Sequence, residues 1–453
     1  MISFVKKKYV GLTSDTRFSE ILTGSAWALS ARVIATAMGL VTSIIIARFY
    51  GAEVMGIVAV LNSFLMLATL FTVLGTGTSI LRLIPEYMVR HSPTAAFRLY
   101  RKTQYFVAGV SLITSALLFL GSGVIADRVF SKPHLQFYFA LAALFIFFQS
   151  LMDLNTQAIR GVRLVRVFAF MQILPSLSKL AILIPITIFC FHPDNPVYAM
   201  FASIAITALA GALIMDRTFK QKTSPHDVLH PMPMKEILSI SLPMLMTAGM
   251  FFLLKQIGVI MLGMYRPESE VGYYAAAVKL AALTAFVFQA INSMAAPKFS
   301  ELFHTGKIDE LFDVARKTAK LMFWTTAPII VFLIVLGRPV LSLLYGDDFA
   351  VAYGVMVILV TGQFINGACG STGIFMNMTG HQKALRNIIA GAAILCVVLN
   401  LALTPVLGMA GAALATIAGI ICWNFAVLIF MKLKFGRTTA YFPLFKTTKG
   451  PHA

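Results

Sequence analysis

The chain has 453 residues, of which 58% are hydrophobic and 12% are charged, and its formal net charge is +19. Soluble domains carry about twice that share of charged residues, so the composition excludes an ordinary soluble protein and indicates a chain that folds in lipid. At roughly 20 apolar residues for each membrane-spanning helix, this length accommodates about a dozen spans and leaves no room for a sizeable soluble catalytic domain.

The apolar runs predict an all-α, polytopic membrane protein with about 12 transmembrane helices. Their expected limits, in chain order, are residues 21–46, 55–84, 102–124, 135–159, 167–190, 197–216, 237–263, 272–297, 318–336, 351–377, 387–406 and 409–431. The apolar stretch that follows Lys6–Lys8 is too long for a cleaved signal peptide, so the first span is expected to remain in the mature protein.

Lysine and arginine gather in alternate loops. The loops expected outside keep only Arg48, Arg128, Lys132, Arg266 and Arg338, and the other basic loop residues fall on the opposite side. Because basic loops stay in the cytoplasm, both termini are predicted to be cytoplasmic. The positive charge is thereby explained by membrane topology, and nucleic acid is not expected as a partner.

The two halves of the chain resemble each other. Glu53-Val54-Met55-Gly56 recurs as Glu270-Val271-Gly272, and Arg160-Gly161-Val162-Arg163 recurs as Thr379-Gly380-His381-Gln382-Lys383, at offsets of about 216 and 219 residues. Six spans with the same topology in each half suggest paired lobes, which is a transporter architecture. The expected division is an N-lobe at 1–220 with spans one to six, a cytoplasmic linker at 221–236, a C-lobe at 237–433 with spans seven to twelve, and a cytoplasmic tail at 434–453.

Ionisable residues inside the spans are functional candidates, because each costs about 2.5–3.5 kcal/mol to insert. The basic candidates are Arg32, Arg82, Lys179, Lys255 and Lys279, against one intramembrane acid, Asp153. Arg82 and Lys279 could instead extend to the headgroups, and Asp153 could instead form an ion pair with Arg160. Arg32 and Lys179 are too deep for that, so they are expected to pair or to face a watery cavity.

A cationic cavity would suit an anionic passenger such as a phosphate or pyrophosphate group. Uncharged polar side chains at depth could bind sugar hydroxyls, or could instead join helices to one another; they are Asn62, Gln149, Gln289, Asn292, Gln363, Asn366, Asn377, Asn400 and Asn424. The sequence shows no catalytic constellation, no nucleotide-binding loop, and no metal-ligand spacing among its four cysteines. We therefore expect neither an enzyme nor a metalloprotein.

Six motifs in order resemble those of one transporter family. They are Arg48-Phe49-Tyr50-Gly51-Ala52-Glu53-Val54-Met55-Gly56, Glu270-Val271-Gly272-Tyr273-Tyr274-Ala275-Ala276-Ala277-Val278-Lys279-Leu280, Pro297-Lys298-Phe299-Ser300-Glu301-Leu302, Tyr345-Gly346-Asp347-Asp348-Phe349, Gly380-His381-Gln382-Lys383 with Leu399-Asn400-Leu401-Ala402-Leu403-Thr404-Pro405, and Gly408-Met409-Ala410-Gly411-Ala412-Ala413-Leu414-Ala415-Thr416. In this order and spacing the chain resembles the Wzx-type polysaccharide flippases of the MOP superfamily, which also contains the MATE multidrug transporters.

The resemblance implies two six-helix lobes around a central cavity lined by spans one, two, seven and eight. It implies flipping of undecaprenyl-pyrophosphate-linked oligosaccharide units across the bacterial cytoplasmic (inner) membrane, without covalent chemistry or a cofactor. Lys279 alone is carried over from a family motif. The expected substrate-binding set is Arg32, Lys179, Lys255, Lys279, Arg82, Asn62, Gln289 and Asn292, with Asp153 as the candidate for proton or sodium coupling. The implied partners are membrane lipids, a polysaccharide polymerase and a chain-length regulator, and the expected state is a monomer.

Two other functions remain open at this stage. A multidrug or cation antiporter of the same superfamily would need buried carboxylates, whereas the first span here carries Arg32. A membrane glycosyltransferase or polymerase would need acidic catalytic residues on a long outer loop, and the outer loops are short. Drug sensitivity or surface polysaccharide after gene deletion would separate these classes.

Overall fold

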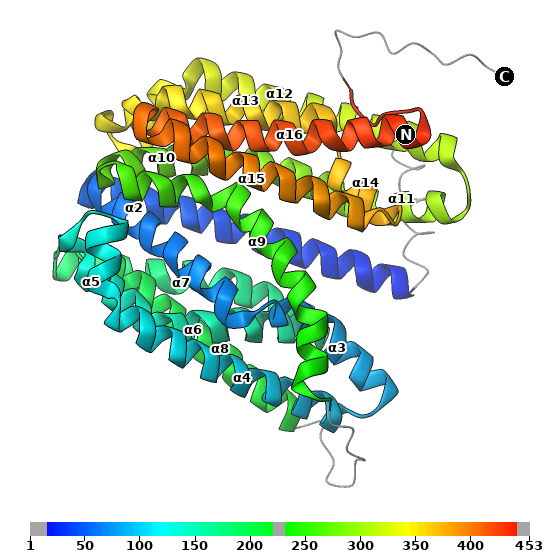
Figure 1. Cartoon of the computed structure of the whole chain (residues 1–453), viewed down its shortest axis with the longest axis horizontal. Coiled ribbons are helices and arrows are strands. Elements are labelled where there is room, and N and C mark those ends of the chain that lie inside the picture. Colours follow the sequence, from blue (N-terminus) through cyan, green and yellow to red (C-terminus); the bar gives the residue numbers. More distant parts are fainter. Residues whose placement is uncertain (1–15, 221–231, 442–453) are drawn as a thin grey trace. The chain divides into compact units, whose positions relative to one another are not determined.

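The computed structural model describes residues 16–220 and 232–441. Within these two ranges every regular element is a helix (Figure 1). The predictions for Lys6–Lys8, for most of the linker at 221–236 and for the tail beyond Tyr441 lie outside the described residues.

Eleven stretches of the described chain are long and apolar enough to cross a membrane. The first, Trp27–Val73, has 47 residues, which at 1.5 Å per residue is about 70 Å and more than twice the thickness of the hydrocarbon core. It lies within helix α2 (Thr16–Val73), which is kinked at Gly51, where φ is 83°. Helix α2 therefore contains the first predicted span and most of the second. The structure confirms the prediction of an all-α, multi-pass membrane protein with about a dozen spans.

The chain separates into two compact units. Unit 1 comprises Met1–Ile46 and Leu61–Ala248, and unit 2 comprises Ala47–Val60 and Gly249–Ala453. Helix α2 and helix α9 (Met234–Tyr265) each contribute residues to both units. The segment Ala47–Val60, which contains the kink at Gly51, thus belongs to unit 2, although the rest of α2 belongs to unit 1.

Unit 1 is a bundle of long helices. After α2 come α3 (Thr76–Arg90), α4 (Pro93–Leu120), α5 (Ser122–Val124), η1 (Ile125–Val129), η2 (Pro133–Leu135), α6 (Gln136–Gly161), α7 (Val165–Phe189) and α8 (Asn195–Lys220). Helix α6 is central, since α3, α4 and α8 all pack against it, and α7 packs against α8 (Figure 1).

The core of unit 1 combines aromatic packing with buried hydrogen bonds between helices. Tyr100 on α4 stacks on Phe219 of α8 and donates to Asn155 Oδ1 on α6 at 2.8 Å. Beside it Arg101 pairs with Asp216 at 2.9 Å. The three helices are therefore tied together by specific contacts as well as by apolar area, and a buried tyrosine hydroxyl finds its partner as expected.

The second predicted span, 55–84, is interrupted in the structure. Leu74 and Gly75 have positive φ values of 49° and 76°, so α2 ends at Val73 and α3 begins at Thr76. The first part of α9 packs at this break: a Cβ on Gly75 would lie 2.3 Å from the carbonyl oxygen of Ser241. The hydroxyls of Ser79 and Ser241 share a buried hydrogen bond of 2.7 Å.

Unit 2 contains more interruptions. It holds the rest of α9, then α10 (Glu268–Ala281), α11 (Thr284–His304), α12 (Ile308–Tyr345), η3 (Asp347–Ala352), α13 (Tyr353–Cys369), α14 (Thr372–Met378), α15 (Gln382–Leu407) and α16 (Met409–Phe435). The predicted spans eight and ten are each divided, into α10 with α11 and α13 with α14. The predicted ninth span, 318–336, is the middle of the much longer α12.

The two repeated motifs contact each other directly in unit 2. A Cβ on Gly56 would lie 1.8 Å from the carbonyl oxygen of Glu268, and a Cβ on Gly272 would lie 2.0 Å from that of Ala52. Each glycine of the repeat therefore packs on the backbone that precedes the other one. Glycine is required at both positions because any side chain would overlap a main-chain atom.

A segment that follows α16 folds back onto unit 2. The backbone N–H of Tyr441 donates to the carbonyl oxygen of Ala368 at 2.9 Å, and the hydroxyl of Thr439 donates to that of Cys369 at 3.3 Å. These two carbonyls lie at the end of α13, where the helix leaves them without intrahelical partners. The predicted tail at 434–453 thus begins inside α16 and continues as a packed segment up to Tyr441.

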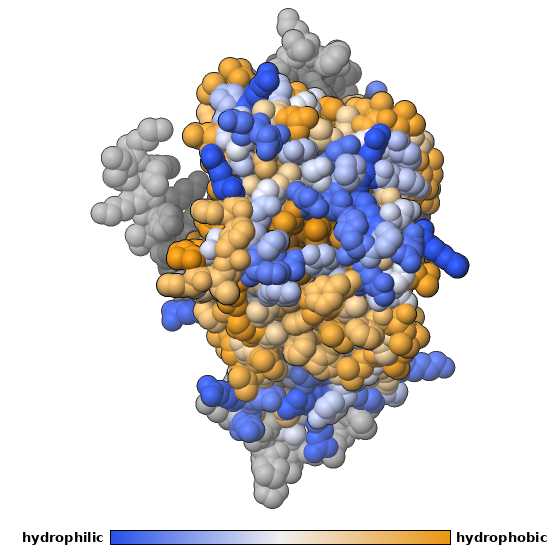
Figure 2. All heavy atoms as spheres, turned by 90° about the vertical axis from the view of Figure 1, so that its left-hand side faces the viewer, coloured by the Kyte–Doolittle hydropathy of each residue, from blue (hydrophilic) through white to orange (hydrophobic). Residues whose placement is uncertain are grey.

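Large apolar side chains are exposed over both units. Leu120, Phe189 and Leu433 are more than 80% exposed, at 81%, 87% and 84%. Figure 2 shows such apolar residues over much of one face, with hydrophilic side chains gathered in patches between them. A soluble protein would not expose so much apolar surface, whereas helices that contact lipid do.

Candidate functional site

The two deepest cations of unit 1 have no partner among the described residues. Lys179 lies 14 residues after the start of α7 and 10 before its end, or about 21 Å and 15 Å at the usual rise. Its side chain is half-buried, and Arg32 on α2 is exposed. Because a charge at this depth is costly in lipid, both side chains require water or an anion.

Two prolines flank Lys179 in its helix. Pro175 and Pro185 both lie inside α7, and each removes one backbone hydrogen bond of the helix. The hydroxyl of Ser178 donates to the carbonyl oxygen of Leu174 at 2.7 Å, at the same turn. Lys179 therefore lies on a part of α7 that lacks two of the usual helical hydrogen bonds.

Asp153 lies on α6 beside the break in the second span. Its Oδ2 would be 3.1 Å from a Cβ placed on Gly77, so glycine at that position makes room for the carboxyl group. No ion pair joins Asp153 to Arg160 in the described part of the chain. The Arg160 guanidinium instead lies 5.4 Å from the centre of the Phe168 ring. The alternative of an Asp153–Arg160 pair is not found, and the role of Asp153 in ion coupling stays a prediction.

The other predicted residues of unit 1 have local contacts. Arg82 Nε lies 4.0 Å from Glu86 Oε2, and Glu86 also pairs with Arg90 at 2.7 Å. The Arg82 side chain is 65% exposed, so this pairing is weak. Asn62 on α2 is exposed, and its amide lies 3.7 Å from the sulfur of Met66 one turn later.

The predicted residues of unit 2 comprise two cations and two amides. Lys255 on α9 is exposed, Lys279 on α10 is half-buried, and each interacts with another group of the chain. Gln289 and Asn292 lie one turn apart on α11 and are both half-buried. The predicted set is thus divided, with Arg32, Arg82, Lys179, Asp153 and Asn62 in unit 1 and the remaining four in unit 2.

Asn292 belongs to a cavity inside unit 2, which we call the amide pocket. Its volume is about 260 Å³, and it is lined by fourteen residues, namely Phe251, Phe288, Asn292, Met322, Asn366, Gly370, Ser371, Thr372, Gly373, Ile374, Asn377, Leu385, Ile389 and Trp423. All fourteen are uncharged. The pocket lies where α13 ends and α14 begins, because the turn at Gly370 (φ 80°) contributes main chain to its wall.

Hydrogen bonds fix one wall of the amide pocket. The Thr372 hydroxyl donates to Asn424 Oδ1 at 2.8 Å, and Asn424 Nδ2 donates to Asn366 Oδ1 at 3.0 Å. Asn366 Nδ2 in turn lies 3.4 Å from Gln363 Oε1. Three of the polar residues identified at depth in the sequence therefore meet in one place with Thr372, which no sequence pattern distinguished.

Two arginines of the predicted outer loops have a structural role. Arg48 donates to the main-chain oxygens of Ser342, Leu343 and Leu344 at the end of α12, and Arg266 donates to those of Pro405 and Val406 at the end of α15. A guanidinium at a helix C-terminus satisfies carbonyls that lack intrahelical partners. Sequence reasoning missed this role, although the offset of 218 residues between the two arginines is close to the offset of about 216 between the glycine motifs.

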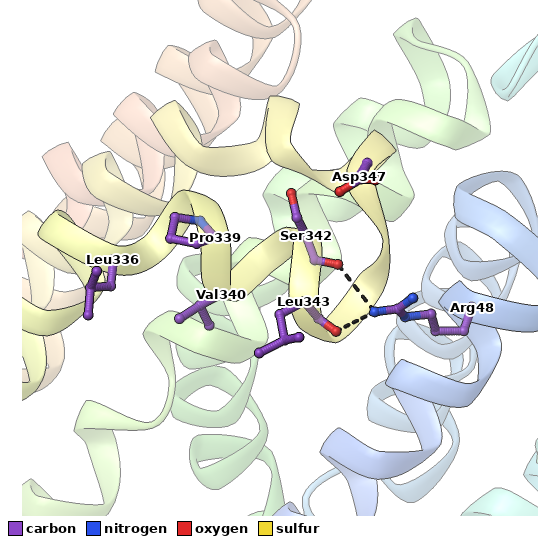
Figure 3. Close-up of a pocket in the computed structure, with 7 residues that line it drawn as sticks. All are labelled: Arg48, Leu336, Pro339, Val340, Ser342, Leu343 and Asp347. Atoms are coloured by element: carbon purple, nitrogen blue, oxygen red, sulfur yellow. Dashed lines mark hydrogen bonds between the residues drawn. The ribbon is translucent and has the colours of Figure 1, made fainter.

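An open cavity of about 630 Å³ lies beside Arg48 (Figure 3). Leu336, Pro339, Val340 and Leu343 of α12 give it mostly apolar walls, and Asp347 contributes a carboxylate. Figure 3 shows the Arg48 guanidinium directed at the carbonyls of Ser342 and Leu343. Because the guanidinium is engaged there, this cavity is a weaker anion site than the position of Arg32 or Lys179.

Fold and charge together define a class, which is a multi-pass membrane protein with two helical units. One unit holds cations that have no partner in the described part of the chain, and the other holds an uncharged pocket. Comparison with known proteins places it within that class. The sequence matches the family described as polysaccharide biosynthesis protein over residues 21–303, which is more than half of the chain. The chain belongs to this family, and the predicted resemblance to Wzx-type polysaccharide flippases is confirmed.

One curated relative is the probable low-salt glycan biosynthesis flippase Agl15 of Haloferax volcanii, which is 24% identical over 162 residues. The match covers 35% of this chain and about a third (34%) of the relative's length. Among solved structures, an inward-facing MATE multidrug transporter of the MOP superfamily matches with a TM-score of 0.72 at 13% identity, covering 91% of this chain and 98% of the other. The lipid II flippase MurJ matches with 0.64 at 15% identity, covering 91% and 87%. These likenesses establish a MOP-like fold.

Proposed function

We propose that the chain flips lipid-linked oligosaccharide units across the cytoplasmic membrane by alternating access, for the synthesis of a surface polysaccharide such as O-antigen, capsule or exopolysaccharide. The carrier lipid that we propose is undecaprenyl pyrophosphate. The observation that carries the proposal is a pair of deep cations, Arg32 and Lys179, that find no partner within residues 16–220 and 232–441, in a member of the polysaccharide biosynthesis family.

The physical argument concerns the anionic linkage of such a substrate. A pyrophosphate cannot cross hydrocarbon unaided, because its charges would lose their hydration. Arg32 can bind phosphate oxygens in a bidentate manner, and Lys179 can act as a point charge. The lipid tail of the substrate would stay in the bilayer while the headgroup passes along the protein, so no covalent step is needed.

A multidrug antiporter is the second candidate, because the MATE transporter is the more similar of the two solved structures described above in fold. At 13% identity this similarity concerns the fold only. Antiport of organic cations requires carboxylates in the path, and the deep ionisable groups of unit 1 are mainly basic. The sign of these charges therefore favours an anionic passenger. Coupling to protons or sodium through Asp153, and cooperation with a polymerase and a chain-length regulator, are further expectations of the same proposal.

Gene deletion tests the proposal directly. The deletion strain should lose the surface polysaccharide and accumulate lipid-linked units that face the cytoplasm, and the wild-type gene should restore export. Normal polysaccharide in the deletion strain, together with new sensitivity to cationic drugs, would instead establish the antiporter.

A further inference from the structure

One wall of the amide pocket in unit 2 is formed by the break between α13 and α14, and contacts with the segment after α16 stabilise this break. Span ten is interrupted at Gly370, and the carbonyls freed at the end of α13 are satisfied by Thr439 and Tyr441 from the segment after α16. Irregular backbone at membrane depth is tolerated where it is buried or lines a cavity. The interruption is therefore a stable feature of unit 2, and it places main chain and small side chains around the pocket.

The pocket contains one buried acceptor that no described group satisfies. Asn292 Oδ1 is buried and has no hydrogen-bond partner. Such an atom costs folding free energy, because it has lost water without gaining a protein donor. Asn292 lines the pocket, so a turn of its amide toward the cavity would let a ligand hydroxyl or amide N–H repair this deficit.

The remaining polar groups favour a ligand that both donates and accepts. Asn366 uses its oxygen for Asn424 and one N–H for Gln363, so a second N–H remains for a ligand acceptor. The oxygens of Asn424 and Asn366 already accept hydrogen bonds from the network. A bare metal cation needs several oxygens that carry no such donors, so this pocket suits hydroxyl groups better than a cation.

Aromatic groups complete the pocket. The indole of Trp423 lies 3.6 Å from the position that a Cβ on Gly373 would take, and Phe251 and Phe288 also contribute to the lining. A sugar ring has apolar C–H faces and polar edges, which match an aromatic surface beside amides and hydroxyls. Because the described lining carries no charge, a neutral sugar avoids the desolvation that an acidic one would suffer.

We propose that the amide pocket binds a neutral sugar residue, with Asn292 accepting from a hydroxyl or N-acetyl group of that sugar and Trp423 packing on its ring. This proposal rests on the proposed function, since it assigns one part of the transported glycan to a site in unit 2. The amide pocket, with a volume of about 260 Å³, accommodates a single monosaccharide unit.

Binding is measured on the full-length protein in which Trp27 and Trp324 are changed to Phe, which leaves Trp423 as the one tryptophan of three. Its fluorescence is titrated with N-acetylglucosamine, glucose, glucuronate and sodium chloride. At least one of the two neutral sugars should give a saturable change, whereas glucuronate and sodium chloride should not. Asn292→Leu should weaken the neutral-sugar response at least about tenfold.

Asn400→Leu is the matched control. Asn400 is also a buried amide of unit 2, but its Oδ1 accepts from Thr404 and its Nδ2 donates to Cys396 within α15. Asn400→Leu should lower thermal stability and leave sugar affinity unchanged. Asn292→Leu should leave stability equal or higher, because it breaks no hydrogen bond of the protein.

Several results would overturn the pocket assignment. They are no response to either neutral sugar, a response to sodium chloride or glucuronate instead, or an equal response in Asn292→Leu. Export separates this failure from that of the proposed function. If gene deletion abolishes surface polysaccharide while Asn292→Leu restores it fully, the sugar site is wrong and the flippase stands. If deletion leaves the polysaccharide intact, the flippase itself is wrong.

Discussion

Units 1 and 2 differ in the kind of polar side chain that they place among their membrane helices. In unit 1 the deep cations Arg32 and Lys179 have no partner among the described residues, whereas in unit 2 Lys255 and Lys279 each interact with another group. Unit 2 instead places uncharged amides around a pocket and joins Asn366, through Asn424, to Thr372 by hydrogen bonds. One unit thus offers charge and the other offers neutral hydrogen bonding.

The difference corresponds to the two chemistries of a lipid-linked glycan, which joins an anionic phosphate linkage to hydroxyl-rich sugars. A site of one kind alone would bind either part poorly, because cations gain little from neutral hydroxyls and amides neutralise little of a pyrophosphate. We therefore interpret the two units as suited to different parts of one substrate. The following changes test this interpretation, beginning with the largest expected effect.

The glycine of the unit 2 repeat motif should not tolerate a side chain. Gly272→Ala would force a Cβ to within 2.0 Å of the Ala52 carbonyl oxygen, so we expect a loss of roughly 3 kcal/mol or more of stability. Gly391→Ala in unit 2 and Gly109→Ala in unit 1 are controls, since a Cβ at either position meets nothing within 4 Å. Thermal unfolding in detergent measures all three, and equal stability of Gly272→Ala and Gly391→Ala would contradict the packing described here.

Charge removal should act mainly through unit 1. Arg32→Gln and Lys179→Gln should each reduce polysaccharide export by about 30-fold, equivalent to about 2 kcal/mol of lost charge interaction. Arg98→Gln, at an exposed position near the start of α4, should export normally. Export is compared at equal amounts of protein in the membrane. Wild-type export by both Arg32→Gln and Lys179→Gln would refute the role of unit 1.

The fixed amides of unit 2 should differ from Asn292 in their effect on stability. Asn424→Leu removes the acceptor of Thr372 and the donor to Asn366, so we expect a loss of about 1.5 kcal/mol. Thr361→Val removes only a bond to the carbonyl of Val357 in its own helix at an exposed position, and should change stability little. Thermal unfolding distinguishes the two variants, and an unchanged Asn424→Leu protein would show that the network does not hold the pocket.

The smallest effect concerns pH. His381 lies between α14 and α15, where burial and the charge of Lys434 lower its pKa, with a partial offset from the hydrogen bond to Thr379. The unfolded chain therefore binds a proton at a higher pH than the folded protein does, and stability falls as the pH drops below the ordinary histidine value of about 6.5. His381→Gln should flatten this decline in melting temperature. An identical decline in both proteins would assign it to other groups.

The all-α architecture and the approximate number of spans could be predicted, because each membrane-spanning helix appears in the sequence as a long apolar run. The kinks were harder: the break at Leu74 and Gly75 and the break at Gly370 lie within apolar sequence, and glycine at a break is not distinguishable from glycine at a close helix contact. The positions of Arg32 and Lys179 follow from the sequence, whereas only coordinates could show that no described residue pairs with them.

The amide pocket shows the limit of the same reasoning. The sequence identified Asn292, Asn366 and Asn424 as polar groups at depth but could not say which of them meet. Their convergence depends on the interruption of span ten and on packing between α11, α13 and α16, which are distant in sequence. The roles of Arg48 and Arg266 were missed for a similar reason, since a helix terminus far along the chain supplies their acceptors.

The most direct test of the central claim is the rate at which a fluorescent oligosaccharide linked to undecaprenyl pyrophosphate moves between the leaflets of vesicles that contain the purified protein. The wild-type protein should move it well above the rate of protein-free vesicles, and Arg32→Gln should reduce the rate close to that background. A wild-type rate equal to background, or a rate that Arg32→Gln leaves unchanged, would contradict the account.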